Sequence, residues 1–130
     1  MYRWVDHTGE LELEILASDE RRVFEEAVAA LRELMENGSG EATETRELEI
    51  AGADRATLLA ECLSELVFYA ETEDFVPLRV GRLDLDARTL RATIEGRLGR
   101  PPHLVKAVTY HRLEFERVPE GWRARVVLDV

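Results

Sequence analysis

Carboxylates are the side chains of this sequence with the clearest capacity for chemistry, and three of interest lie near the two ends of the chain. Asp6 and Glu10 flank the small polar segment His7-Thr8-Gly9, and Asp129 precedes the last residue, Val130. Clustered carboxylate oxygens are the ligands that Ca²⁺ and Mg²⁺ prefer. On spacing alone, these are a few of 27 acidic residues, most of which are expected to form solvated surface.

Histidines are the rival metal ligands. Imidazole nitrogen would favour Zn²⁺ over Ca²⁺, and His7 and His111 could each supply one. Neither belongs to a His-x-x-x-His pair, and a lone histidine is more often a hydrogen-bonded structural residue than a ligand. The third histidine, His103, follows two prolines and is expected in a loop.

Sequence signatures of enzymes are absent. The chain has no Gly-rich phosphate loop, no paired cysteines at metal-ligand spacing and no Gly-x-Ser-x-Gly nucleophile turn. The single cysteine, Cys62, falls within a predicted apolar helix stripe, where a small core residue is expected rather than a reactive thiol. The sequence therefore favours a protein that binds over an enzyme.

Composition narrows the class of protein further. With 130 residues the chain is expected to form one domain, residues 1–130, and a single cysteine excludes an internal disulfide. No apolar run is long enough to span a membrane and no signal peptide is recognisable, which predicts a cytoplasmic protein. A formal net charge of −10 argues against direct nucleic-acid binding and suits a basic partner or a cation.

The elements that must position these residues follow from hydrophobic periodicity. Alternation predicts strands over residues 2–6, 10–16 and 43–50, the last at a sheet edge. Apolar residues at helical spacing predict a helix from the Ser18-Asp19 cap to a stop at residues 37–40, and a second helix after the Asp54 cap. We therefore expect an α+β fold with a largely antiparallel sheet covered by two amphipathic helices.

The C-terminal part of the chain has period two from Phe75 onward, with breaks at residues 86–88 and 99–102, which predicts four or five strands. The last two strands flank Pro119-Glu120-Gly121 and indicate a β-hairpin, because Gly121 can adopt the positive φ that such loops need. In the final strand Asp129 is expected on the face opposite the core residues Trp122, Ala124, Val126 and Leu128.

These segments carry a resemblance to a known family. Val105-Lys106-Ala107-Val108-Thr109-Tyr110-His111, an acidic hairpin and the final Val126-Val127-Leu128-Asp129-Val130 resemble the C-terminal signature of the archease family. Archeases are small proteins that assist the GTP-dependent tRNA-splicing RNA ligase of the RtcB type. Asp6-His7-Thr8-Gly9-Glu10 is similar to the family's acidic-His-Thr-Ala-Asp motif, with Gly9 in place of Ala and Glu10 in place of Asp. Glu12 stands where the family usually has Gly.

The resemblance implies a site and a function. The family's divalent-metal site, carried over residue by residue, corresponds to Glu10, Asp129 and Val130, with Asp6 and His7 as additional candidates. Ca²⁺ is the expected ion, and Mg²⁺, Mn²⁺ and Zn²⁺ are alternatives. The implied function is that of a non-enzymatic accessory protein that promotes guanylylation and multiple turnover of the RNA ligase in tRNA splicing. The alternatives are a small metal-dependent hydrolase and a chaperone-like modulator of RNA-modification proteins.

Overall fold

A computed structural model describes residues 1–35, 41–102 and 105–130 of the chain. In these ranges the element order is β1 (Tyr2–His7), β2 (Glu10–Ala17), α1 (Glu20–Met35), β3 (Glu44–Ala51), α2 (Arg55–Glu73), β4 (Phe75–Leu85), β5 (Thr89–Leu98), β6 (Ala107–Val118) and β7 (Gly121–Asp129). The expected helix stop at residues 37–40 and the expected loop position of His103 lie outside the described residues.

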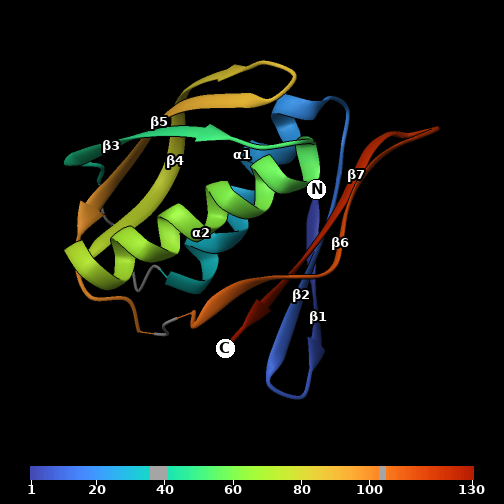
Figure 1. The fold of residues 1–130 in the computed structure, drawn as a ribbon. Coiled ribbons are helices and arrows are strands. Elements are labelled where there is room, and N and C mark those ends of the chain that lie inside the picture. The colour runs from blue at the N-terminus through green and yellow to red at the C-terminus, as the bar shows by residue number, and fades with distance from the viewer. Residues whose placement is uncertain (36–40, 103–104) are drawn as a thin grey trace.

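The strands divide between two sheets that enclose the helices. One sheet has the order β1-β2-β7-β6 and the other β3-β5-β4, and neighbouring strands are antiparallel throughout. The helices lie between the two sheets, with α1 in contact with β2 and β4 and α2 in contact with β6 and β4 (Figure 1). The predicted α+β class with antiparallel strands and two helices is confirmed, as is the edge position of β3.

Both helices begin where the sequence predicts, at aspartate caps. The carboxylate of Asp19 accepts a hydrogen bond from the backbone N–H of Arg22 at 2.9 Å, and that of Asp54 accepts from Thr57 at 2.8 Å. The Thr57 bond also lowers the pKa of Asp54, since it stabilises the ionised form. These bonds satisfy N–H groups that have no partner within the helix. No helix within the described ranges is long and apolar enough to cross a membrane.

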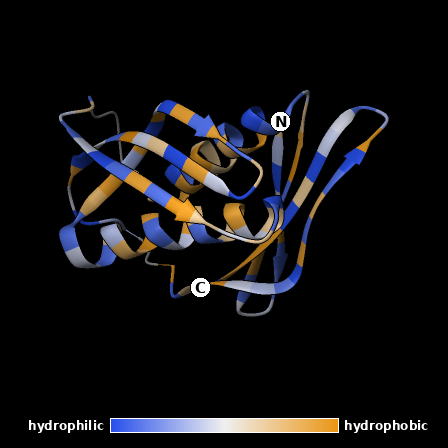
Figure 2. Cartoon of the chain, turned by 45° about the horizontal axis from the view of Figure 1, so that its top comes forward, coloured by the Kyte–Doolittle hydropathy of each residue, from blue (hydrophilic) through white to orange (hydrophobic). Residues whose placement is uncertain are grey.

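The core fills the space between the sheets and the helices. Apolar and polar residues alternate along the strands, so each sheet turns one face to the helices (Figure 2). Cys62 of α2 belongs to this core with 3% exposure, and burial raises the pKa of its thiol to about 12, which confirms the prediction of a core residue. The largest fully buried side chains come from both sheets and both helices: Leu13, Ile15, Phe24, Leu31, Met35, Leu58, Leu59, Leu63, Leu66, Phe75, Leu90 and Ile94.

The predicted C-terminal hairpin is formed by β6 and β7. Val118 pairs with Gly121, so the connection consists of Pro119 and Glu120. Gly121 has φ of +132°, and a Cβ added there would lie 2.3 Å from the backbone oxygen of Ala17. Gly121 therefore lets the hairpin close against the end of β2.

We expect Gly121→Ala to destabilise the fold by about 3–5 kcal/mol, because backbone strain at positive φ adds to overlap with the β2 backbone. Gly9 is a matched control, since it has φ of +74° but nothing within 4 Å of an added Cβ. Gly9→Ala should cost only the strain, about 1–2 kcal/mol. Urea denaturation of both variants measures the difference, and equal losses would contradict the close approach at Gly121.

Candidate functional site

Glu10 and Asp129 are direct neighbours, as the metal site implied by the resemblance requires. They occupy opposed positions in the β2–β7 ladder, so their side chains leave the same face of the sheet. Side chains at such positions have Cβ atoms about 4.5–5.5 Å apart, within reach of a shared cation. The backbone is held from both sides: Val130 N–H donates to the Gly9 oxygen at 3.3 Å, and Lys106 N–H donates to the Asp129 oxygen at 2.8 Å.

The two additional candidates, His7 and Asp6, lie on opposite faces of the sheet. His7 lies opposite Glu10 in the β1–β2 ladder and so belongs to the same face. Asp6 lies opposite Leu11, which puts its side chain on the other face. The His7 Nε2 atom is 3.8 Å from Oε1 of Glu12, so the imidazole lies beside another carboxylate of the same strand face. His111 is exposed, within a bulged part of β6.

The carboxylates at this end of the sheet differ in how they are paired. Asp129 is exposed and has no ion pair or side-chain hydrogen bond among the described residues. In the part of the chain that the structure describes, Glu10 makes one ion pair, in which its Oε2 is 3.5 Å from Nη2 of Arg112. Within residues 1–35, 41–102 and 105–130, no three His, Cys, Asp or Glu side chains are grouped closely enough to hold a metal ion. Glu10 and Asp129 therefore supply two carboxylates, and a cation bound there would need further ligands such as backbone oxygens or water.

Glu12 is the most buried charged residue on this face, with 7% of the surface of the whole residue exposed. Its carboxylate lies 3.4 Å from Arg112 Nη2, 3.7 Å from Arg125 Nε and 3.8 Å from His7 Nε2. A buried carboxylate without partners would be strongly unfavourable, and these groups supply the compensating charge. Nε of Arg125 is buried and has no hydrogen-bond partner in the described structure, so the compensation is electrostatic rather than a complete hydrogen-bond network.

Arg112 reaches Glu10 and Glu12 because β6 is irregular at this point. The β6–β7 register shifts between Thr109 and Glu114, and Arg112 has φ of +56°, a conformation unusual for a residue other than Gly. The extra residues form a bulge, which we define as residues 110–113 and call the β6 bulge. Sequence reasoning missed the Glu12–Arg112 contact. The signal that could have found it is the departure from the family's Gly at Glu12.

The β6 bulge is also tied to helix α2. The hydroxyl of Tyr110 donates a hydrogen bond to Oε1 of Glu61, although the tyrosine remains 54% exposed. This bond to a carboxylate, followed by partial burial, raises the pKa of Tyr110 to about 12. One end of the bulge thus contacts the helix, and Arg112 contacts the carboxylates of β2.

Beyond Glu12 the same sheet face continues as a series of ion pairs. Arg125 lies 3.0 Å from Glu114, and Arg3 lies 2.5 Å from Glu14. Arg123 lies 3.9 Å from Glu114 and is also paired with Glu116. Along this stretch the acidic side chains are paired with arginines. Unpaired acidic charge on this face therefore lies at the end of the sheet that carries Asp129.

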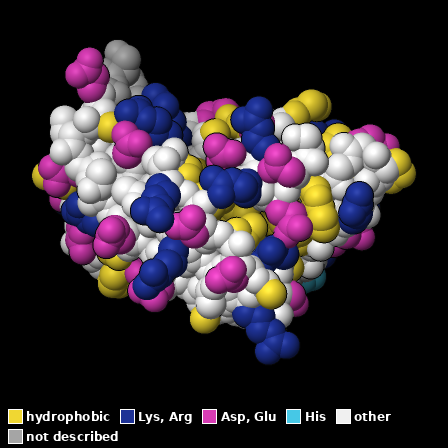
Figure 3. Space-filling view, turned by 90° about the horizontal axis from the view of Figure 1, so that it is seen from above, with side chains coloured by type: hydrophobic (Ala, Val, Ile, Leu, Met, Phe, Trp, Pro, Cys, Tyr) yellow, Lys and Arg dark blue, Asp and Glu magenta, His cyan; other side chains and the backbone are white. Residues whose placement is uncertain are grey.

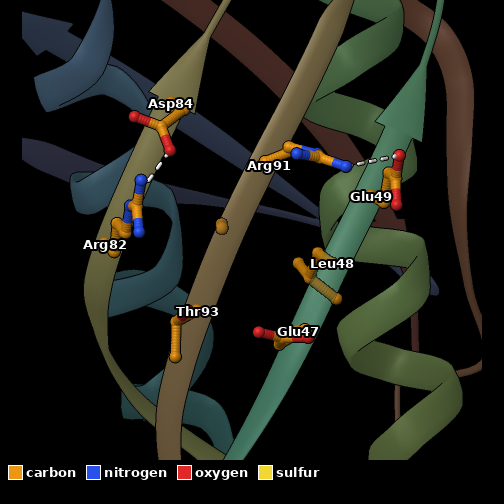
Figure 4. Close-up of a pocket in the computed structure, with 8 residues that line it drawn as sticks. Glu47, Leu48, Glu49, Arg82, Asp84, Arg91 and Thr93 are labelled. Atoms are coloured by element: carbon orange, nitrogen blue, oxygen red, sulfur yellow. Dashed lines mark hydrogen bonds and ion pairs between the residues drawn. The ribbon is translucent and has the colours of Figure 1, made fainter.

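A separate hollow of about 260 Å³ lies on the three-stranded sheet (Figure 4). Arg82 is 3.1 Å from Asp84 along β4, and Arg91 of β5 is 3.2 Å from Glu49 of β3. Figure 4 draws these two ion pairs apart from each other, so the groups that form them do not converge on one point. Seen from above, the surface likewise mixes acidic and basic side chains (Figure 3).

Comparison with known proteins finds one family along the whole chain. A family model described as the archease protein family (MTH1598/TM1083) matches residues 2–130. The archease proteins of Methanothermobacter thermautotrophicus and Archaeoglobus fulgidus are similar to this chain, at 33% and 32% identity, over 99% of it and 98% of each relative.

Solved structures show the same fold. The solution structure of Methanobacterium thermoautotrophicum protein 1598 superposes with a TM-score of 0.79 at 31% identity, over 99% of this chain and 98% of that one. A Thermotoga maritima crystal structure, called "an archease, possible chaperone", has a TM-score of 0.72 at 23% identity, over 100% of this chain and 98% of that one. At that lower identity the likeness concerns the fold alone.

Glu12 should matter for stability and Glu10 should not. Glu12→Gln would leave two arginines and a histidine around a neutral amide, and we expect a loss of about 1–3 kcal/mol. Glu10→Gln removes one exposed 3.5 Å ion pair and should stay within about ±0.5 kcal/mol. Thermal and urea denaturation of the two variants, which change the net charge equally, test the assignment. A larger loss for Glu10→Gln would contradict it.

Proposed function

The chain belongs to the archease family, and from this we propose that it is a non-enzymatic accessory protein of the GTP-dependent tRNA-splicing RNA ligase of the RtcB type. In this proposal it promotes guanylylation and multiple turnover of the ligase during tRNA splicing, with the aid of a divalent cation. The observation that carries the proposal is the direct opposition of Glu10 and Asp129 in the β2–β7 ladder.

The residues present fit a hard divalent cation. Glu10 and Asp129 offer carboxylate oxygens on one sheet face, and backbone oxygens of Val130 follow directly in the chain. Ca²⁺ accepts six to eight oxygen ligands in flexible arrangements, which suits a pair of exposed carboxylates completed by backbone and water. Mg²⁺ and Mn²⁺ use the same donors. Zn²⁺ would draw on His7, which lies in the adjacent position of β1.

The cation, when bound, would supply a compact positive charge at the surface. What the chain itself does is hold the two carboxylates at fixed spacing. Backbone hydrogen bonds on both sides of β7 limit the movement of Asp129, and the ladder sets the position of Glu10 relative to it. A pre-positioned pair of ligands lowers the ordering cost of binding, because the carboxylates need not be brought together first.

An accessory protein can activate a ligase only by binding its competent state better than the alternative. Each factor of ten in that preference shifts the equilibrium by about 1.4 kcal/mol. The net charge of −10 supports contact with a basic region of a protein partner and not with an RNA backbone. The mixed-sign surface in Figure 3 shows no extended basic patch on the face that it presents.

Assays of the purified protein, with and without the ligase, distinguish the proposed function from its two rivals. A metal-dependent hydrolase would turn over phosphoesters without the ligase, and a general chaperone would suppress aggregation of unrelated proteins without GTP or metal. The proposed accessory protein should do neither, and should increase the rate of ligase guanylylation with GTP and Ca²⁺. Hydrolysis by the purified chain alone would overturn the proposal.

Asp129→Asn should remove the function and spare the fold. Asp129 is exposed and faces away from the core, so we expect the free energy of unfolding to change by no more than about 0.5 kcal/mol. The loss of one of two charged side-chain ligands should lower Ca²⁺ affinity by at least about tenfold, because such sites are tuned by ligand charge. Single-turnover guanylylation and calorimetric Ca²⁺ titration measure the two effects.

Asp84→Asn is the matched control, since Asp84 is an exposed aspartate of the other sheet with the same charge. It should bind Ca²⁺ and stimulate the ligase like the unchanged protein. Equal behaviour of the Asp129 and Asp84 variants would remove Asp129 from the site.

A further inference from the structure

We propose that Arg112 is a built-in competitor for the cation at Glu10 and Asp129. In the absence of metal its guanidinium occupies the Glu10 carboxylate, and cation binding requires Arg112 to give that carboxylate up. The inference rests on the metal site proposed above and concerns how that site is regulated.

The geometry places Arg112 between two carboxylates of one strand. Its Nη2 atom lies 3.5 Å from Oε2 of Glu10 and 3.4 Å from Oε1 of Glu12. Glu10 and Glu12 are two residues apart in β2, so both side chains leave the same sheet face. The guanidinium is therefore shared between an exposed carboxylate of the proposed site and a buried one beside it.

The two ion pairs of Arg112 differ in how strongly water weakens them. The Glu10 side chain is 38% exposed, so water competes for its contact with Arg112. The Glu12 side chain is 9% exposed, and its pair with Arg112 is screened less. Arg112 can release Glu10 and keep Glu12, which makes the exchange a short side-chain movement within the face.

The backbone indicates that the chain holds Arg112 there at a cost. A non-Gly residue at φ of +56° is strained, and Arg112 adopts this conformation in the β6 bulge. The bulge aims its side chain across β7 to β2, which a regular strand would not do. Neighbouring Tyr110 anchors the bulge to Glu61 of α2. The contact with Glu10 is thus a product of an irregularity, not of ordinary strand pairing.

Electrostatics gives the sign of the effect. A guanidinium at 3.5 Å neutralises much of the Glu10 charge and repels a second cation at the same oxygens. Removing this positive charge without removing a ligand should strengthen Ca²⁺ binding by about tenfold at low ionic strength, and by less at high salt. A purely structural role for Arg112 predicts the opposite, because Glu10 would lose its positioning contact.

Calorimetric Ca²⁺ titration of the metal-free full chain tests the proposal. Arg112→Gln removes the charge, and Arg112→Lys keeps a positive charge on a flexible side chain at the same residue. Arg123→Gln is the matched control, because Arg123 lies on the same face but pairs with Glu114 and Glu116, and its opposite residue in β2 is Leu16. We expect Arg112→Gln to bind Ca²⁺ about tenfold more tightly, and both other variants to remain within about twofold of the unchanged protein.

Each result of these titrations either supports or overturns the proposal. Tighter binding by Arg112→Gln alone supports the proposal, as does binding by Arg112→Gln when the unchanged protein binds none. Equal or weaker binding by Arg112→Gln, with binding by the unchanged protein that is lost in Asp129→Asn, overturns the competitor and leaves the metal site standing. Equal gains in Arg112→Gln and Arg123→Gln would reveal a general charge effect and overturn it too. No binding by any of these proteins would overturn the site and the competitor together.

Discussion

The pairing of β2 with β7 is the constraint on which the rest of the structure depends. It joins an early strand to the last one, from Glu10 opposite Asp129 to Ala17 opposite Trp122. Strands β1 and β6 add to its two sides to complete the sheet. Because side chains alternate with period two, a slip of one residue would turn Leu13 and Val126 to solvent and the charged residues to the helices. The register is therefore strongly specified by burial.

The two faces of this ladder have different energetics. The inner face contributes side chains such as Leu13, Ile15 and Val126, which are at most 1% exposed, and its stabilisation comes from removing apolar surface from water. The outer face is built from ion pairs around the buried Glu12, whose desolvation offsets much of their attraction. The inner face supplies stability, and the outer face determines which charges remain available to a ligand.

The irregular β6 bulge connects the proposed site to the rest of the molecule. The Tyr110 hydroxyl donates a hydrogen bond to Glu61 of α2, and Arg112 forms ion pairs with Glu10 and Glu12 of β2. A partner that contacts α2 or the bulge would therefore act on residues that also contact the acidic site. The three-stranded sheet carries its own ion pairs.

The sequence by itself determined the local structure. Asp54 marks the start of α2, Gly121 marks the hairpin, and the apolar periods mark the strands, because caps, turn conformations and burial patterns depend on residues close together in the chain. The proximity of Glu10 and Asp129 came from the family resemblance, since spacing alone could not distinguish them from other acids. Only the tertiary structure divided the strands between two sheets, by pairing β5 with both β3 and β4. It alone also brought Arg112 to Glu12. That contact joins residues a hundred positions apart through a bulge and a buried charge, and such long-range side-chain pairing follows from register and packing, which no local pattern encodes.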